Sequence, residues 1–413
     1  MGAPRSQIPS HIISGAEMRV KMEKTLLGRT EEYYIRRSAV HTVTEILQQP
    51  ALWRRLADVL CGREEEIHTF MEEVMAVEHL RIVFTGAGSS AFVGESMQCL
   101  LANEMGILSE TIHTTDFISM PDSTYADVPT LLISYARSGE SPESCATIRF
   151  AEKKISRLYQ VIIVCDKNSS LARLGYASKN TLVLDMPPEA CDQGFAMTSS
   201  VSCMALATWC LFHHGQISVY ADHIRALADS AERDMEQLDK KAFEIAQKDY
   251  RRLIWLGTGA MRGLAREGAV KSMELTNGCV HAGYDAATGF RHGPKTVIND
   301  ETLTVHFLSN QPYSLQYDVD LARELVEEKK KNLVAVVTGS AHGGMIPGAD
   351  YEVTYEIPES LPANSEMGAY IKGLLFVQLL SLEKSLEKNM TMDNPCPGGE
   401  VNRVVRGVVI YDI

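Results

Sequence analysis

One α/β pattern occurs twice along this chain, and the duplication limits the possible folds more than any other sequence feature. The segment "LRIVFTGAGSSAFVGES" in the first half is echoed by "RRLIWLGTGAMRGLAREGA" in the second. Ser138 follows Gly86 by 52 positions, and Ser309 follows Gly257 by the same 52 positions. Because the order and the spacing of the elements both agree, we interpret the two halves as copies of a single unit.

Apolar runs of strand length alternate with helix-like segments, which is typical of parallel βαβ units with helices on both faces of a sheet. The first half holds "LRIVFTG", "ETIHTT", "TLLISYA", "YQVIIVCD" and "NTLVLD", and "LTVHFLSN" and "NLVAVVTG" match two of these in the second. A chain of 413 residues also exceeds the usual size of one core. We therefore predict an α/β protein with two parallel-sheet αβα sandwiches. The expected parts are an N-terminal helical extension (1–50), a first α/β domain (51–215), a helical linker (216–248), a second α/β domain (249–395) and a C-terminal tail (396–413).

Two stretches outside these units are predicted to be helical. In "TVTEILQQPALWRRLADVL", Pro50 marks either a break or a restart of the helix. A long helical stretch is expected from about Thr198 to Gln247, and it contains the apolar run 201–212.

The composition excludes several classes of function. The formal net charge is −13 and the basic residues form no block, which argues against nucleic acid or an anionic membrane as a partner. Nine cysteines without a C-x-x-C pair indicate reduced thiols rather than disulfides or structural zinc. No apolar run reaches the ~20 residues of a spanning helix, and the N-terminus lacks the order of a secretory signal. We therefore expect a cytoplasmic protein.

Small hydroxyl residues and a glycine stand where the strand "TLLISYA" gives way to a helix. Ser141 suits the N-cap of that helix, and Pro142 suits its first position. Free backbone N–H groups at a helix N-terminus, with Ser138 and Ser141 beside them and Gly139 allowing close approach, form a ready site for an anion such as phosphate. The alternative is a plain capping turn without a ligand.

A second turn of the same kind, "GAGSS", follows the first strand with Gly88, Ser89 and Ser90. Two such turns in one half-sheet favour a phosphate-bearing ligand, whereas a dinucleotide is disfavoured because no acid ends the next strand, "ETIHTT". A third hydroxyl cluster, "MTSS", contains Thr198 and Ser199 at the start of an apolar helix. For that cluster, helix capping and ligand binding remain equal alternatives.

The segment "VKSMELTNGCVHAGYDAATGFRHGPKTVIND" holds the residue types needed for proton transfer. Lys271 and Glu274 are three apart and can share one helix face, and His292 stands in a loop bracketed by glycine and proline. A carboxylate and a histidine can move protons at neutral pH. The alternatives are a solvated helix charge and a packing histidine. Neither H-x-x-x-H nor H-x-x-E-H occurs, so we expect no catalytic metal and no cofactor.

The combination of "FTGAGSS", "ARSGESPES", "MTSS" and "GFRHGP" resembles the sugar isomerase (SIS) superfamily, in the two-copy arrangement of the isomerase half of glucosamine-6-phosphate synthase. The chain looks most like the tagatose-6-phosphate ketose/aldose isomerase family, whose members are linked to deamination of galactosamine 6-phosphate. The similarity runs from about residue 42 to the end. It implies two SIS domains, each a flavodoxin-like αβα sandwich.

The resemblance also implies roles for individual residues. Glu274 matches the proton-transferring glutamate, and His292 matches a histidine that assists ring opening and is lent by the neighbouring subunit, which implies a homodimer or larger homo-oligomer. Arg406 stands near an essential tail lysine of the synthase, so Schiff-base chemistry by a lysine there is not expected. With Glu274 and His292 as catalytic residues, the expected substrate and phosphate ligands are Gly88, Ser89, Ser90, Arg137, Ser138, Ser141, Thr198, Ser199, Lys271 and Arg406.

The function implied is that of an amino-sugar-phosphate deaminase/isomerase, which converts galactosamine 6-phosphate to tagatose 6-phosphate and ammonia. One alternative is a ketose/aldose phosphosugar isomerase without deamination, and another is a non-catalytic sugar-phosphate sensor. No basic helix-turn-helix segment is visible to support a sensor. The preference between galactosamine and glucosamine epimers stays open, because no motif fixes recognition at C4.

Overall fold

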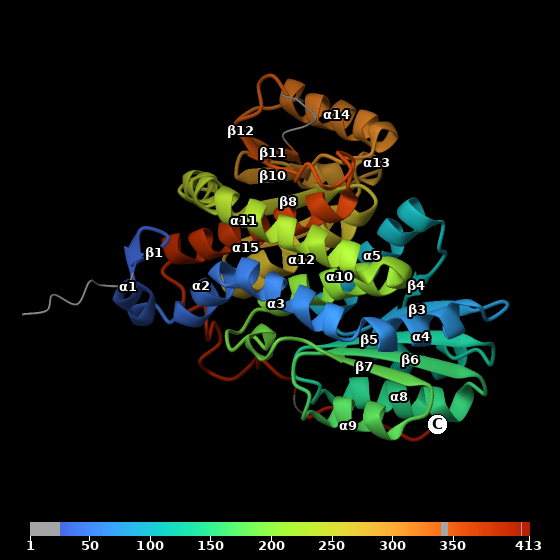
Figure 1. Ribbon diagram of the computed structural model, residues 1–413. Coiled ribbons are helices and arrows are strands. Elements are labelled where there is room, and N and C mark those ends of the chain that lie inside the picture. Colours follow the sequence, from blue (N-terminus) through green and yellow to red (C-terminus); the bar gives the residue numbers. More distant parts are fainter. Residues whose placement is uncertain (1–24, 340–345, 406) are drawn as a thin grey trace, which may run out of the picture.

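Two parallel five-stranded sheets organise the computed structural model, which describes residues 25–339, 346–405 and 407–413 (Figure 1). The first sheet contains β3 (Arg81–Thr85), β4 (Glu110–Thr111), β5 (Thr130–Ala136), β6 (Leu158–Val164) and β7 (Thr181–Asp185), and the second contains β8 (Arg252–Gly257), β9 (His281–Asp285), β10 (Thr302–Phe307), β11 (Leu333–Gly339) and β12 (Tyr351–Tyr355). Their orders are β4-β3-β5-β6-β7 and β9-β8-β10-β11-β12. Numbered within each copy, both read 2-1-3-4-5, so the predicted duplication is confirmed.

The strands match the expected pattern except at the edges of the sheets. The central strands β5 and β10 are buried along their whole length, as parallel strands covered on both faces must be. The predicted strand in "ETIHTT" shrinks to the two residues of β4. Strand β9 lies within the segment singled out for its chemistry, where no strand was predicted. Only Ala282 of its five residues is buried, so the segment contains no continuous apolar run.

A layer of helices lies between the two sheets, and further helices cover their outer faces (Figure 1). The inner layer comprises α3 (Gln49–Gly62), α5 (Ser89–Met105), α10 (Ser199–Phe212), α11 (Ile217–Ala246), α12 (Ala260–Leu275) and α15 (Glu366–Glu387), and the outer helices are α8 (Pro142–Lys154) and α9 (Ser170–Ala177) on the first sheet and α13 (Ala287–Phe290) and α14 (Pro312–Glu327) on the second. One continuous hydrophobic core runs from Phe84 in the first sheet to Phe307 in the second. The two copies are therefore packed on a shared layer.

The first described residues form a hairpin that the predicted helical extension (1–50) did not include, and residues 1–24 of that extension lie outside the described residues. Strands β1 (Thr25–Leu26) and β2 (Arg29–Thr30) pair antiparallel, with Leu27 and Gly28 at positive φ in the turn. The remaining helices are α1 (Glu31–Arg36), α2 (Val40–Leu47), α4 (Glu64–Met75), α6 (Thr114–Ser119) and α7 (Pro121–Thr124). Pro50 lies in the first turn of α3, so it restarts the helix.

The stretch predicted as helical from 198 to 247 is interrupted at His213. Helix α10 ends there, a 3₁₀ turn covers His214–Gln216, and α11 follows. Within the described residues, no helix combines the length and the apolar character needed to cross a membrane.

Helices α5 and α12 pack antiparallel across the interface between the copies. Ser96 Oγ donates to the carbonyl of Ala260, and a Cβ on Gly263 would come within 2.3 Å of that hydroxyl oxygen. Near the other end of the pair, Lys271 Nζ donates to Ser89 Oγ. The C-terminal half of α12 thus reaches the turn that begins α5, and this crossing places side chains of the second copy at the first copy's sheet edge.

Candidate active site

The turn after β3 brings the backbone close to the start of α5. A Cβ on Gly86 would lie 2.6 Å from Ser90 Cβ, and Gly88 has a φ of 56°. Both positions therefore require glycine. Ser89 and Ser90 open the helix and are 5% and 4% exposed. The structure thus places two hydroxyl groups at a helix N-terminus, as the sequence predicted.

The turn after β5 has the same character. Gly139 has a φ of 64°, and a Cβ there would lie 2.3 Å from Ser169 Oγ. Ser141 is the N-cap of α8 and Pro142 its first residue, as predicted, but Ser141 Oγ donates to Glu143 Oε2 at 2.5 Å instead of accepting from the helix. Because β3 and β5 are neighbours, both turns lie at one carboxyl edge, where ligands bind in sheets of this order.

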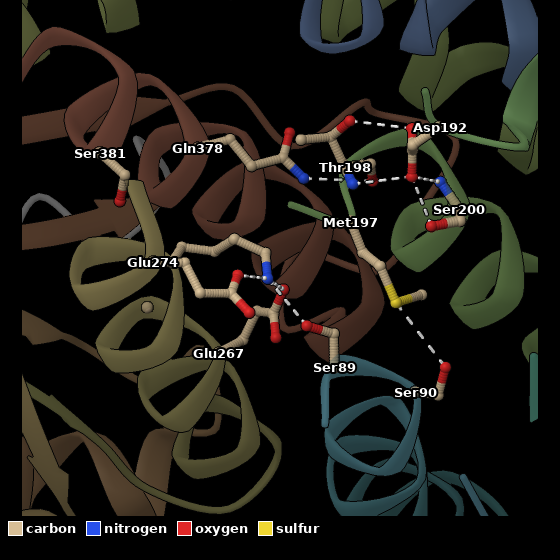
Figure 2. A network of polar contacts seen from close by, with 12 residues as sticks. Ser89, Ser90, Asp192, Met197, Thr198, Ser200, Glu267, Glu274, Gln378 and Ser381 are labelled. Carbon is tan, nitrogen blue, oxygen red and sulfur yellow. Dashed lines mark hydrogen bonds and ion pairs between the residues drawn. The ribbon is translucent and has the colours of Figure 1, made fainter. Parts of the chain in front are cut away.

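A charged cluster from α12 adjoins the first of these turns. Lys271 Nζ lies 2.8 Å from Ser89 Oγ, 3.0 Å from Glu274 Oε2 and 3.2 Å from Glu267 Oε1. Figure 2 shows the two carboxylates and Ser89 directed toward one another. The side chains of Lys271 and Glu267 are each 1% exposed, whereas that of Glu274 is 32% exposed. Glu274 is thus the carboxylate that a ligand can reach.

Burial and pairing set the protonation of this cluster. Burial disfavours the charged form of Lys271, but the carboxylates of Glu267 and Glu274 outweigh it and raise the pKa of that ammonium. Burial also raises the pKa of the Glu267 carboxyl, against the attraction of Lys271. Lys271 therefore stays cationic at neutral pH and holds Glu274 by a charge-assisted hydrogen bond.

Near the second turn, Arg137 forms hydrogen bonds with two other segments of the chain. Its guanidinium donates to the carbonyls of Gly194 and Phe195 at 3.3 and 3.1 Å, and to the carbonyl of Arg403 in the C-terminal tail at 2.9 Å. Arg403 in turn donates to the carbonyl of Asp192 at 2.7 Å. The charges of Arg137 and Glu274 are close enough to interact. Phosphate binding by Arg137 stays a prediction, and Arg406 lies outside the described residues.

The third hydroxyl cluster is engaged within the protein. Asp192 accepts the backbone N–H groups of Thr198, Ser199 and Ser200 at 2.9 to 3.1 Å, together with the hydroxyl of Thr198. The hydroxyl of Ser199 donates to the carbonyl of Glu45. The carboxylate of Asp192 therefore accepts hydrogen bonds from the free backbone N–H groups at the start of α10 (Figure 2). A substrate contact by Thr198 or Ser199 remains a prediction.

In the second copy, the turn that corresponds to the Ser138 turn contains an internal carboxylate. The carboxylate of Asp318 accepts from the backbone N–H of Ser309 at 2.9 Å and from Thr258 Oγ1 at 2.6 Å. Ser309 is the counterpart of Ser138, and Thr258 follows Gly257 in the second copy. This internal pairing supports the interpretation that the first copy binds the ligand.

His292 lies on the surface of the protein. It is exposed in the loop after α13, its backbone N–H donates to Gly289, and Gly293 follows with a φ of 122°. Among the described residues, no hydrogen bond or ion pair joins His292 to Lys271 or Glu274. A role for His292 in catalysis therefore stays a prediction.

Sequence reasoning gave no role to Asp192 or Arg403, and it named Glu267, with Asp285, only as a substitute for Glu274 as the catalytic carboxylate. Glu267 stands four residues before Lys271, and this spacing predicts that the two side chains share one helix face and can form an ion pair. Asp192 caps backbone N–H groups six to eight residues ahead without a recognisable motif, and Arg403 acts on a carbonyl 211 residues away.

The fold and these turns define an SIS-type α/β protein, and residues 75–214 match the family model described as "SIS domain". The chain is 36% identical over 372 residues to D-galactosamine-6-phosphate deaminase AgaS of Escherichia coli, which covers 90% of this chain and 95% of that protein. It is 33% identical over 383 residues to AgaS of Shewanella sp. (strain ANA-3), with 90% and 92% covered. The chain therefore belongs to the AgaS family of SIS-domain proteins. The structure of tagatose-6-phosphate ketose/aldose isomerase from Escherichia coli agrees with a TM-score of 0.82 at 32% identity, covering 90% of this chain and 96% of that one.

Proposed function

We propose that this protein converts galactosamine 6-phosphate and water to tagatose 6-phosphate and ammonia. The observation that carries this proposal is the Lys271–Glu274 pair. It places a partly exposed carboxylate beside the serine turn at the ligand-binding edge of the first sheet. The AgaS relatives, which align over most of the chain, support the same substrate.

The phosphate binds to the turns that contain Ser89 and Ser138, where small hydroxyls adjoin helix N-termini. In the open-chain sugar, Glu274 removes the proton from C2 while the C1 carbonyl oxygen takes up a proton from solvent, which gives an enolamine. Glu274 returns its proton to C1 as the electron pair of the amine forms the C2–N double bond, which gives a 2-iminium sugar. Water then adds to the imine carbon and ammonia leaves, which balances the reaction as a hydrolysis.

Lys271 serves this chemistry as a fixed positive charge. It donates to Glu274 Oε2 and so sets the orientation of the base, while the same ammonium donates to Ser89 in the phosphate turn. Glu267 lies behind it, with Oε1 3.2 Å from the same ammonium. The base and the phosphate site are thereby held in one geometry.

We also propose that the protein assembles into an oligomer, because the resemblance to the synthase implies that a neighbouring subunit lends His292. We expect a homodimer or larger homo-oligomer in which His292 of the partner subunit assists ring opening. We also propose that the two SIS domains span residues 51–215 and 249–395. The protein is further proposed to act in the cytoplasm. No nucleic acid or membrane partner is involved.

Isomerisation without deamination is the second candidate, since an SIS structure from Escherichia coli carries the name of a ketose/aldose isomerase. Purified protein is incubated with galactosamine 6-phosphate, glucosamine 6-phosphate and galactose 6-phosphate, and ammonia and ketose phosphate are measured. Ammonia from an amino sugar establishes the deaminase. Ketose formation from galactose 6-phosphate alone establishes the isomerase, and binding without turnover establishes a sensor.

A further inference from the structure

Three metal-ligating side chains meet outside the site described above, where α4 contacts the corner between α10 and α11. His68 and Glu72 are four residues apart and share one face of α4, and His214 begins the 3₁₀ turn. The Nδ1 atoms of His68 and His214 are 3.2 Å apart, and Glu72 Oε2 lies 3.9 Å from His214 Nδ1. All three ligand atoms lie within 4.8 Å of one another.

This geometry suits a small divalent cation. Bonds of about 2.0–2.1 Å to a tetrahedral Zn²⁺ place neighbouring nitrogen ligands roughly 3.3 Å apart, close to the separation of the two imidazole nitrogens. Without a cation, His68 and His214 must share one proton, because two facing lone pairs repel. Two imidazoles and a carboxylate match Zn²⁺ and its first-row neighbours better than Mg²⁺ or Ca²⁺, which prefer oxygen ligands.

The surroundings leave room to complete such a site. A cavity of about 440 Å³ is lined by both imidazoles and by Glu64 and Glu65. Water in this cavity can occupy the remaining coordination positions of the ion, and the two glutamates make the electrostatic potential around it negative. The side chain of His214 is only 16% exposed and is held against the corner. That of Glu72 is 71% exposed and can rotate to close the longer distance.

We propose that His68, Glu72 and His214 bind a transition-metal ion of the Zn²⁺ type. The ion would join α4, which precedes the first strand of the first sheet, to the corner that leads into α11. Its role would be structural, because these residues are not part of the Lys271–Glu274 cluster. The proposal is therefore compatible with the expectation of no catalytic metal.

The test is a titration of chelator-treated, tag-free protein with ZnCl₂ by calorimetry. We expect one site whose affinity falls at least about tenfold in His68→Ala and in His214→Ala. His41→Ala, which removes an exposed histidine of α2, should leave that site unchanged. Zn²⁺ should raise the melting temperature of the wild type and of His41→Ala, but not of His68→Ala, and MgCl₂ should raise none of them.

Co²⁺ gives a second readout that depends on neither stability nor activity. Visible absorption of a nitrogen-ligated Co²⁺ should form in the wild type, and Glu72→Gln should weaken binding or change the spectrum. Equal stoichiometry and affinity for Zn²⁺ in the wild type and in the His68→Ala/His214→Ala variant would overturn the proposal. Loss of sugar-phosphate turnover after chelator treatment would overturn the structural role assigned to the ion.

Discussion

The ammonium of Lys271 lies 2.8 Å from the hydroxyl of Ser89, although the two residues belong to different copies of the duplicated unit. The same ammonium holds Glu274 at 3.0 Å. One buried side chain thus joins the turn expected to bind phosphate to the carboxylate expected to move the proton. A disturbance of either copy should therefore affect both functions.

Glu274→Gln should lower kcat for galactosamine 6-phosphate by roughly 10²–10⁴-fold with little change in KM, because it removes a positioned general base but keeps the shape. Steady-state kinetics check this, with Glu236→Gln, at an exposed position of α11, as the control. In D₂O, the wild type should place deuterium at C1 of the ketose. A loss of activity below about threefold would make Glu274 an ordinary surface charge.

Ser138→Ala combined with Ser141→Ala should raise KM for sugar phosphates well above any change in kcat. A remote phosphate is bound equally in the ground state and the transition state, so its hydroxyl donors contribute to binding alone. Helix α8 should persist, since Ser141 Oγ does not cap it. Ser123→Ala on α7 serves as the control. An unchanged KM in the double variant would place the phosphate elsewhere.

Mixing inactive Glu274→Gln with inactive His292→Ala protein should restore part of the activity if the partner subunit supplies His292. A mixed dimer then rebuilds one intact site, whereas each variant alone has none. Turnover is measured after subunit exchange, and native mass spectrometry verifies that exchange occurred. Mixtures that exchange and yet stay inactive would show that both residues serve one subunit's site.

Stability should fall as pH rises through neutrality because of the carboxyl group of Asp239. Burial, together with repulsion from Glu383, raises the pKa of Asp239 to about 7. The folded state therefore keeps a proton that the unfolded chain loses near pH 4. This contribution is fully present below about pH 4 and is lost as pH rises toward 7 and above.

Asp239→Asn removes that titration, so the stability of the wild type relative to this variant should decrease between pH 5 and pH 8. Because Asp239 is partly exposed, we expect a change of roughly 1 kcal/mol. Urea unfolding at several pH values measures it. Half-buried His213 and His214, whose lowered pKa values act in the opposite direction, contribute equally to both proteins and cancel. A constant difference in stability across this range would contradict the assignment.

The prediction succeeded where local chemistry determines structure. The turn around Gly139 followed from a buried strand, small hydroxyls and a proline placed at a helix start, all within ten residues. It failed at residues 25–30, where a hairpin turn passes through Leu27 at positive φ, a conformation that leucine seldom adopts. It also missed β9, whose polar and small residues carry little strand signal.

The sequence by itself determined the two α/β copies, the central strands of each and the chemistry of the glycine-serine turns, because these depend on periodicity and backbone preferences over short distances. Only the tertiary structure decided which groups meet across the copies. Lys271 and Ser89 are 182 residues apart, and Arg137 and the Arg403 carbonyl are 266 apart. Their contacts arise from the antiparallel packing of α5 on α12 and from the path of the tail. Many side chains of the shared layer fix that packing together, and no single motif encodes it.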